Sequence, residues 1–253
     1  MRTARISSTL AAFALAATAA PAAAIVGGSP DNGAHPEVGA LISPTQYADG
    51  TWLECTGTLI SPTVFLTAAH CYQGLNRVQV TFDDQYVGDG GGGLLGTFHS
   101  DPAFNPNAGN VEDDVAVVVL DKAVRNLTPA ALPRLNSLAK LPKNALITSV
   151  GYGATLVSQG GGPKTLTYTD SRNVATGTLN ALTSSALKVS EKVSAGNGGT
   201  CYGDSGGPNF VGTTNVIAGT TITGDTWCGS TNVDFRLDTP AARDFLGQFV
   251  RLP

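Results

Sequence analysis

The sequence has few charged residues, few histidines and no basic cluster. Only 13% of its 253 residues are charged, and the formal net charge is −4. We therefore expect no nucleic-acid partner and no association with a membrane surface. The three histidines form no H-E-x-x-H motif, which excludes zinc hydrolases of that type. The length provides for one large or two small domains.

The apolar N-terminal segment, residues 1–24, has the composition of a secretory signal peptide. Arg2 and Arg5 precede an apolar region, and three alanines at 22–24 end it. The segment is too short to span a membrane and ends in small residues that suit a cleavage site. We therefore expect a secreted, extracellular protein.

The chain has four cysteines, and this even number after an export signal favours disulfides over free thiols or metal ligands. Four cysteines allow three pairings, and the spacing does not choose among them. They are Cys55, Cys71, Cys201 and Cys228.

Short β-type runs separated by Gly, Pro, Asn and Asp fill most of the chain, which predicts an all-β sandwich or barrels. One helix is predicted at the end, because Thr239 is a good N-cap and Pro240 suits the first helical position. The apolar face of that helix would hold residues 242, 245, 246, 249 and 250. The strand runs are 64–66, 77–82, 115–120, 146–150, 165–169 and 216–222.

Two segments combine a nucleophile with a base. The run 201–208 reads C-Y-G-D-S-G-G-P, and the run 67–71 reads T-A-A-H-C. A serine hydroxyl needs a base to take its proton, and His70 is the candidate for Ser205. Glycines beside the serine let the backbone bend sharply, so that N–H groups can meet a developing oxyanion. Activity should rise through neutral pH, because the base must be neutral.

The run 203–207 also fits the G-x-S-x-G pattern of α/β-hydrolase esterases and lipases. That fold places its histidine after the serine in the chain. His99 is the last histidine here, so chain order excludes this class.

Four motifs together resemble the chymotrypsin and trypsin family of serine proteases. Besides the two runs above, Ile25-Val26-Gly27-Gly28 is similar to that family's mature N-terminus, and 114–117 is similar to its Asp-Ile-Ala-Leu strand. The resemblance implies a secreted serine endopeptidase that forms an acyl-enzyme. It also implies two six-stranded antiparallel β-barrels with a C-terminal α-helix, at 25–130 and 131–253, with a linker near 122–136.

The resemblance assigns His70, Asp114 and Ser205 as the catalytic triad, with the backbone N–H groups of Gly203 and Ser205 as the oxyanion hole. The neighbouring Glu112 and Asp113 would then be solvated. His35 and His99 are expected to be structural.

The resemblance also implies how the enzyme is switched on. The new amino terminus at Ile25 would fold inward and pair with Asp204, since burying either charge alone is costly. Because three alanines precede Ile25, we expect that removal of the signal peptide activates the chain without a separate zymogen step. A competing cut after Ala22 would leave a two-residue stub, Ala23-Ala24, that needs trimming. The implied disulfides are Cys55–Cys71 and Cys201–Cys228.

The substrate pocket implied by the resemblance has Gly199 at its floor beside Thr200, and Gly224 on its wall. A neutral floor favours an uncharged side chain before the cut bond. Either Asn232 or Val233 would face inward, and a basic preference would return if Asp234 entered the pocket.

Two departures from the family's pattern leave a second interpretation open. The first is that the loop 229–234 is shorter than is usual in the family, and the second concerns Ile222. Ile222 stands where relatives carry a serine that supports the catalytic aspartate, and Thr221 or Thr223 would have to replace it. A catalytically weak or inactive binding protein of this fold is therefore the alternative.

The implied partners are polypeptide substrates and protein protease inhibitors, and the implied state is a monomer without cofactor. Asp83, Asp84 and the Gly-rich run 89–94 lie where some relatives bind calcium. We expect solvated turn residues there and no metal.

Overall fold

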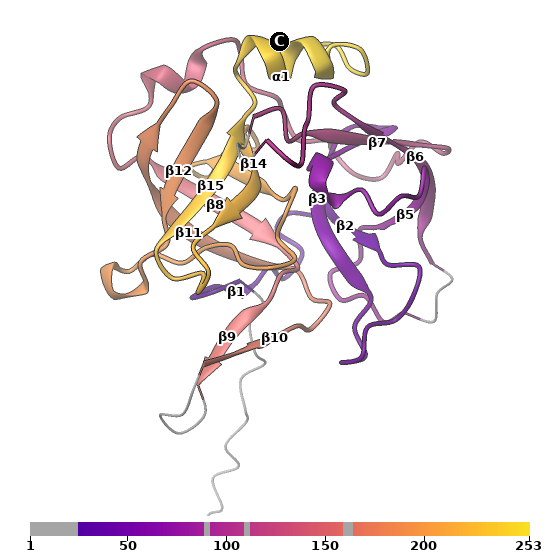
Figure 1. The fold of residues 1–253 in the computed structure, drawn as a ribbon, viewed down its shortest axis with the longest axis horizontal. Coiled ribbons are helices and arrows are strands. Elements are labelled where there is room, and N and C mark those ends of the chain that lie inside the picture. Colours follow the sequence, from indigo (N-terminus) through magenta and orange to yellow (C-terminus); the bar gives the residue numbers. More distant parts are fainter. Residues whose placement is uncertain (1–24, 89–91, 109–111, 159–163) are drawn as a thin grey trace, which may run out of the picture.

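The structure is a computed structural model that describes residues 25–88, 92–108, 112–158 and 164–253. The predicted signal peptide and part of the Gly-rich run, 89–91, lie outside the described residues. The described chain forms two β-barrels side by side, with one helix across the end of the second (Figure 1). The predicted architecture of two six-stranded antiparallel barrels and a C-terminal helix is confirmed.

The first barrel closes in the order β2-β3-β4-β7-β6-β5, and β2 pairs with β5 to complete it. Its shortest strand, β4, is buried along its whole length, and Phe65 at its centre is fully buried. The short 3-10 helix η1, Ala69–Cys71, follows β4 directly. The strands are β2 Val38–Ile42, β3 Leu53–Ser61, β4 Val64–Thr67, β5 Arg77–Thr81, β6 Leu94–Ser100 and β7 Ala116–Leu120.

The second barrel runs in the order β11-β12-β15-β14-β13-β8 and closes through pairing of β8 with β11. The short strand β1, Ser29–Pro30, adds to β11 from the N-terminal segment. The strands are β8 Leu146–Gly151, β11 Asn173–Leu182, β12 Ala186–Ser190, β13 Pro208–Val211, β14 Ile217–Gly224 and β15 Thr231–Arg236.

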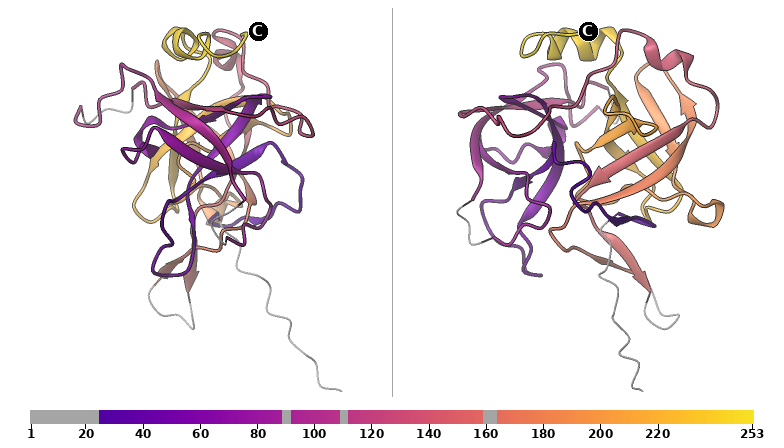
Figure 2. Two further views of the ribbon diagram at one scale, coloured as in Figure 1. Left: turned by 90° about the vertical axis from the view of Figure 1, so that its right-hand side faces the viewer. Right: turned by 180° about the vertical axis from the view of Figure 1, so that it is seen from behind.

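A separate hairpin, β9 Thr155–Ser158 and β10 Lys164–Thr167, projects from the second barrel at the end opposite the helix (Figure 2). Two further 3-10 turns, η2 Ser137–Lys140 and η3 Val193–Ala195, complete the described elements.

The C-terminal helix α1, Pro240–Leu246, begins as its sequence predicts. The Thr239 hydroxyl accepts the N–H of Ala242, which satisfies one of the free donors of the first turn. The apolar pattern continues to residue 250, but the helix ends at Leu246. Phe249 and the residue after it continue as turns, yet both still pack against the core.

One apolar core runs through both barrels and under the helix. It joins Phe65 of the first barrel to Phe210 and Phe235 of the second and to Phe245 of α1. A smaller cluster around Leu187 fills the far end of the second barrel. The continuous core fixes the two barrels relative to each other.

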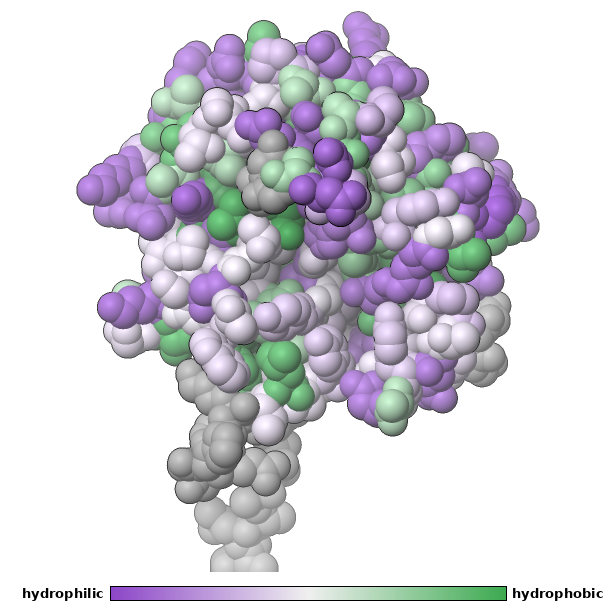
Figure 3. Space-filling model, viewed as in Figure 1, coloured by the Kyte–Doolittle hydropathy of each residue, from purple (hydrophilic) through white to green (hydrophobic). Residues whose placement is uncertain are grey.

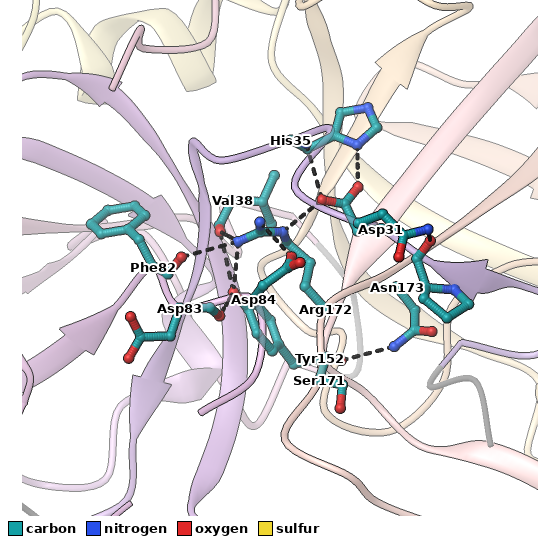
Figure 4. Close-up of polar contacts among 12 residues, drawn as sticks. Asp31, His35, Val38, Phe82, Asp83, Asp84, Tyr152, Ser171, Arg172 and Asn173 are labelled. Carbon is teal, nitrogen blue, oxygen red and sulfur yellow. Dashed lines mark hydrogen bonds and ion pairs between the residues drawn. The ribbon is translucent and has the colours of Figure 1, made fainter. Parts of the chain in front are cut away.

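A buried arginine also joins the barrels (Figure 4). Arg172, just before β11, donates from Nη1 to the carbonyl oxygens of Val38 and Phe82 in the first barrel. Its Nη2 lies 2.6 Å from Oδ1 of Asp84, and its Nε lies 2.9 Å from Oδ2 of Asp31. Burial alone would raise the pKa of Asp31, but hydrogen bonds from His35 and Arg172 lower it to about 2.

The same network accounts for two side chains singled out in the sequence. His35 is a structural histidine, since it bonds Asp31 and stacks on Phe210. Asp84 serves as an ion-pair partner of Arg172.

Hydrophilic and hydrophobic residues are interspersed on the face of the molecule shown in Figure 3. No helix among the described residues is long and apolar enough to cross a membrane.

Candidate active site

Strand pairing brings the predicted base and carboxylate together. His70 lies in η1 just after β4, and Asp114 lies just before β7. Because β4 and β7 are antiparallel neighbours, with Thr67 opposite Ala116, the end of one strand adjoins the start of the other. Nδ1 of His70 lies 2.7 Å from Oδ2 of Asp114, and the backbone N–H of His70 donates to Oδ1 at 3.0 Å.

The side chains of Asp114 and His70 differ in how far they are buried, and this difference suits their two expected roles. The Asp114 side chain is 8% exposed and the His70 side chain 33% exposed. A buried carboxylate at Nδ1 fixes the tautomer in which Nδ1 carries the proton, leaving Nε2 free to accept one. Of the three neighbouring acids, Asp114 is therefore the one the fold places against the histidine, while Glu112 is exposed.

The turn that carries Ser205 is held to the first barrel by backbone contacts. The N–H of Thr56 in β3 donates to the Ser205 carbonyl at 2.9 Å, and the Thr56 hydroxyl donates to the Gly203 carbonyl at 2.9 Å. Gly206 has a φ of +79°, and a Cβ there would lie 2.2 Å from the Thr67 hydroxyl oxygen. Only glycine fits at this close approach, so the turn can lie against the strand that leads to His70.

Ser205 and His70 line one cavity between the barrels, with Thr200, Thr221 and Gly224 also in its wall. Among the hydrogen bonds of the described residues, none joins the Ser205 hydroxyl to the imidazole. Catalytic hydrogen bonds are often long or poorly aligned when no substrate is bound. The observation that matters here is therefore that both side chains line the same cavity.

The backbone N–H groups of Gly203 and Ser205 are free to act as oxyanion donors. In the described part of the chain, neither donates to a protein acceptor. Gly203 has a φ of +95°, which an L side chain rarely adopts. A Cβ there would lie 3.0 Å from Cα of Gly153, so glycine is required both for the conformation and for the space.

Two disulfides bracket the site, and they have the pairing that the family resemblance implied. Cys55 bonds Cys71, the residue after His70, and Cys201 bonds Cys228. Closing loops of this size is worth roughly 3 kcal/mol in the chain-entropy model, and each bridge also anchors one catalytic segment.

One group of potential metal ligands within the described residues adjoins this site. It consists of His70, Cys55 and Cys71, whose ligand atoms lie within 4.8 Å of one another. Both sulfur atoms belong to the disulfide and are not thiolates, which are the form of cysteine that ligates metal.

Asp204, next to the nucleophile, is fully buried. Its carboxylate accepts the N–H groups of Gly153 and Cys201, each at 2.8 Å. Burial raises the pKa of Asp204 to about 7, since no cation of the described chain pairs with it. The segment that begins at Ile25 lies nearby: Ile25 is fully buried, and Val26 pairs with Gly199.

The support expected for Asp114 from Thr221 or Thr223 is not found among the described residues. Ile222 lines the cavity. Thr221 bonds Asp234 instead, and no hydrogen bond of the described residues joins Thr221 or Thr223 to Asp114. The contacts from His70 therefore carry the positioning of Asp114.

The residues expected to form the substrate pocket divide into two groups. Thr200 and Gly224 line the cavity. Gly199 and Asn232 are buried behind it, and Val233 is only half-buried. Asn232 thus faces the interior of the second barrel, and Asp234, two residues along the same strand, faces the same way.

Sequence reasoning missed two residues near the site, Thr56 and Glu191. Thr56 holds the nucleophile turn, and Glu191 reaches the back of the cavity from the end of β12. No local motif marks either residue. The contact of Thr56 with Gly203 joins segments that are distant in the sequence, and the contact of Glu191 with Thr200 spans a loop of nine residues.

Two antiparallel barrels, with a serine and a histidine lining one cavity and a buried aspartate hydrogen-bonded to that histidine, define a serine endopeptidase of the two-barrel type. The model of the trypsin family matches residues 25–245, and the chain belongs to this family.

Individual relatives agree with this assignment. The chain is 28% identical to trypsin-2 of Salmo salar over 165 residues, which cover 61% of this chain and 67% of that protein. A solved structure of HL collagenase has the same fold, with a TM-score of 0.67 and 21% identity over 90% of this chain and 96% of that one.

Proposed function

We propose that this protein is a secreted endopeptidase that cuts polypeptides through the triad Ser205, His70 and Asp114. The observation that carries the proposal is the buried Asp114 at 2.7 Å from Nδ1 of His70, whose imidazole lines the same cavity as Ser205. A signal-like N-terminus and two disulfides support export.

The reaction has two halves. Oγ of Ser205 attacks the carbonyl carbon of the peptide bond while Nε2 of His70 takes its proton. The N–H groups of Gly203 and Ser205 stabilise the oxyanion, the C–N bond breaks, and the imidazolium returns the proton to the leaving amine. Water then attacks the acyl-serine with His70 again as base, which releases the acid and restores the hydroxyl.

Activation follows from the surroundings of Asp204. Cutting before Ile25 creates an ammonium group, and the adjoining Val26 already pairs with Gly199 and packs with Cys201, whose N–H donates to the Asp204 carboxylate. Ile25 has a φ of +70° in the uncut chain, which is unfavourable for a β-branched residue. The cut removes that constraint and supplies a cation for Asp204, so both effects favour the inserted terminus.

A covalent probe tests the proposal directly. A fluorophosphonate should label the cut chain once, on Ser205, and the Ser205→Ala variant should take up none. An uncut chain that keeps Ala24 should react far more slowly. Absence of labelling in the cut, folded chain would favour the inactive binding protein instead.

A further inference from the structure

Thr56, in strand β3 of the first barrel, contacts the segments of both the base and the nucleophile. It is fully buried. Its carbonyl accepts the hydroxyl of Thr67, which leads into the segment of His70, at 2.9 Å. Its N–H donates to the Ser205 carbonyl, and its hydroxyl donates to the Gly203 carbonyl. The first two contacts use the backbone of Thr56, whereas the contact with Gly203 needs a hydroxyl side chain.

The same hydroxyl joins the nucleophile turn to the second barrel. Oγ1 of Thr56 accepts the N–H of Tyr152 at 3.1 Å, and Tyr152 directly follows β8. Gly151 leaves room for this contact, because a Cβ there would lie 3.0 Å from Oγ1. The hydroxyl therefore accepts one hydrogen bond and donates another, and these two partners fix its orientation.

Three consecutive peptide units, which run from residue 202 to residue 205, carry the two oxyanion donors. A trans peptide unit is planar, so its N–H points away from the carbonyl oxygen of the same unit. Whatever holds the carbonyl therefore also aims the N–H. In the first unit, the N–H of Ala154 donates to the Tyr202 carbonyl at 2.7 Å. In the third unit, the N–H of Gly207 donates to the Asp204 carbonyl at 2.9 Å.

The middle unit, between Gly203 and Asp204, links the two donors, and its carbonyl is held by a side chain. Its N–H donates to the Cys201 carbonyl at 3.0 Å, and its carbonyl accepts the Thr56 hydroxyl at 2.9 Å. Gly203 has a φ of +95°, and glycine has more backbone freedom than any other residue. Without the hydroxyl, only the N–H holds this unit within the described part of the chain. The unit can then turn about the Gly203 backbone, and the two donors no longer converge on one point.

We propose that the Thr56 hydroxyl is a positioning group for the oxyanion hole, because it fixes the orientation of the Gly203 and Ser205 N–H groups relative to each other. Such donors stabilise the transition state when they are aimed in advance at the point where charge develops. The oxyanion occupies that point, and the carbonyl oxygen of the bound substrate does not, so the role concerns kcat more than KM. This inference rests on the proposed function, and it gives a side chain of the first barrel a part in the reaction.

The Thr56→Val variant tests the role, because valine has nearly the shape of threonine and lacks the hydroxyl. The substrate is whichever peptide anilide ending in Phe, Leu or Arg the mature protein cleaves fastest. We expect kcat to fall by about tenfold or more, towards the 10²-fold that a misplacement of roughly 1 Å can cost, with little change in KM. Thr56→Ser keeps the hydroxyl and should restore kcat. If the valine variant does not fold, Thr56→Ala provides the same loss of the hydroxyl. An unchanged kcat in the folded variant would overturn the proposal.

Thr58 provides a matched control in the same strand. It is also fully buried, and its hydroxyl has no hydrogen-bond partner among the described residues. Thr58→Val should therefore keep the kcat and KM of the mature protein. A loss equal to that of Thr56→Val would mean that the packing of β3, rather than the bond to Gly203, sets the rate. The proposal would then be wrong.

A peptide aldehyde with the sequence of the chosen substrate tests the oxyanion hole itself. Its carbon bonds to Oγ of Ser205, and its oxygen then occupies the place of the oxyanion. Because this adduct resembles the transition state, its dissociation constant should rise in Thr56→Val by about the factor by which kcat falls. Binding of the uncleaved substrate to the Ser205→Ala variant should not change when Thr56→Val is added. An unchanged dissociation constant for the aldehyde would contradict the proposed role.

The directions of the two N–H groups can be measured without catalysis. Residual dipolar couplings from NMR report the direction of each backbone N–H relative to the rest of the chain. In the mature protein, Thr56→Val should change the couplings of Gly203 and Ser205, and Thr58→Val should not. If the couplings change in a protein that takes up no fluorophosphonate, the positioning role is supported and only the proposed function fails. Unchanged couplings in Thr56→Val would refute the positioning role.

Discussion

The buried carboxyl of Asp204 should make the uncut chain less stable as pH rises, and cutting before Ile25 should abolish this effect. In the uncut chain, burial raises the pKa of Asp204 from 3.8 to about 7. Between these two values, the folded chain holds a proton that the unfolded chain has lost. The free energy of unfolding therefore falls as pH rises from about 4 to 7 and levels off above.

The magnitude follows from the two pKa values. Because one pKa unit corresponds to about 1.36 kcal/mol, the contribution of Asp204 to this loss is at most roughly 4 kcal/mol. That is a large share of the stability of a typical protein, about 5–15 kcal/mol. In the cut chain, the Ile25 ammonium stabilises the charged form of Asp204. The loss of folding stability with rising pH should then disappear. The cut protein should also be more stable at pH 8 than the uncut chain.

Urea unfolding between pH 4 and 8, followed by the fluorescence of Trp52 and Trp227 with disulfides intact, measures the effect. The comparison uses the uncut chain that keeps Ala24 and its Asp204→Asn variant. Buried acids that Asp204 does not affect, such as Asp170, titrate in both proteins, and their contributions cancel in the difference. The asparagine substitution changes the free energy of unfolding by an amount that does not vary with pH. The quantity compared is therefore the slope of that free energy against pH. Parallel pH profiles for the two proteins would refute the reasoning.

Three further predictions concern the triad, the barrel interface and processing. Asp114→Asn should lower kcat by roughly 10⁴-fold, because the amide favours the wrong histidine tautomer, whereas Asp113→Asn should have little effect; equal losses would contradict the assignment. Arg172→Met should cost roughly 3–5 kcal/mol in urea unfolding, because it leaves the buried Asp31 carboxylate without its arginine, while Arg77→Met at an exposed ion pair should change little. Active protein from the medium should begin at Ile25 by N-terminal sequencing, and active material with two further alanines would contradict one-step activation.

Much of the fold could be predicted because its signals are local. The N-cap at Thr239 and Pro240 gave the start of the helix, and the strand runs matched observed strands, since alternation and turn residues act over a few positions. The end of the helix was wrong, because the apolar contacts of Phe249 are satisfied by turns as well as by a helix.

The candidate nucleophile and base were also readable from the chain, because short motifs carry them. Ser205 lies among glycines that allow a sharp turn, and His70 is followed by a cysteine that can form a disulfide. The choice of Asp114 over its neighbouring acids depended on resemblance alone until the pairing of β4 with β7 placed it against His70.

The sequence by itself determined which reactive groups are present and the short elements that carry them, because residue type and the signals of caps and turns are read over a few positions. Only the tertiary structure decided that Arg172 bridges the barrels and that Glu191 stands behind Gly199. The physical reason is that burial and hydrogen bonding set the charge and energy of these side chains. Both depend on how the barrels form and pack against each other, which the residues adjacent in the sequence do not specify.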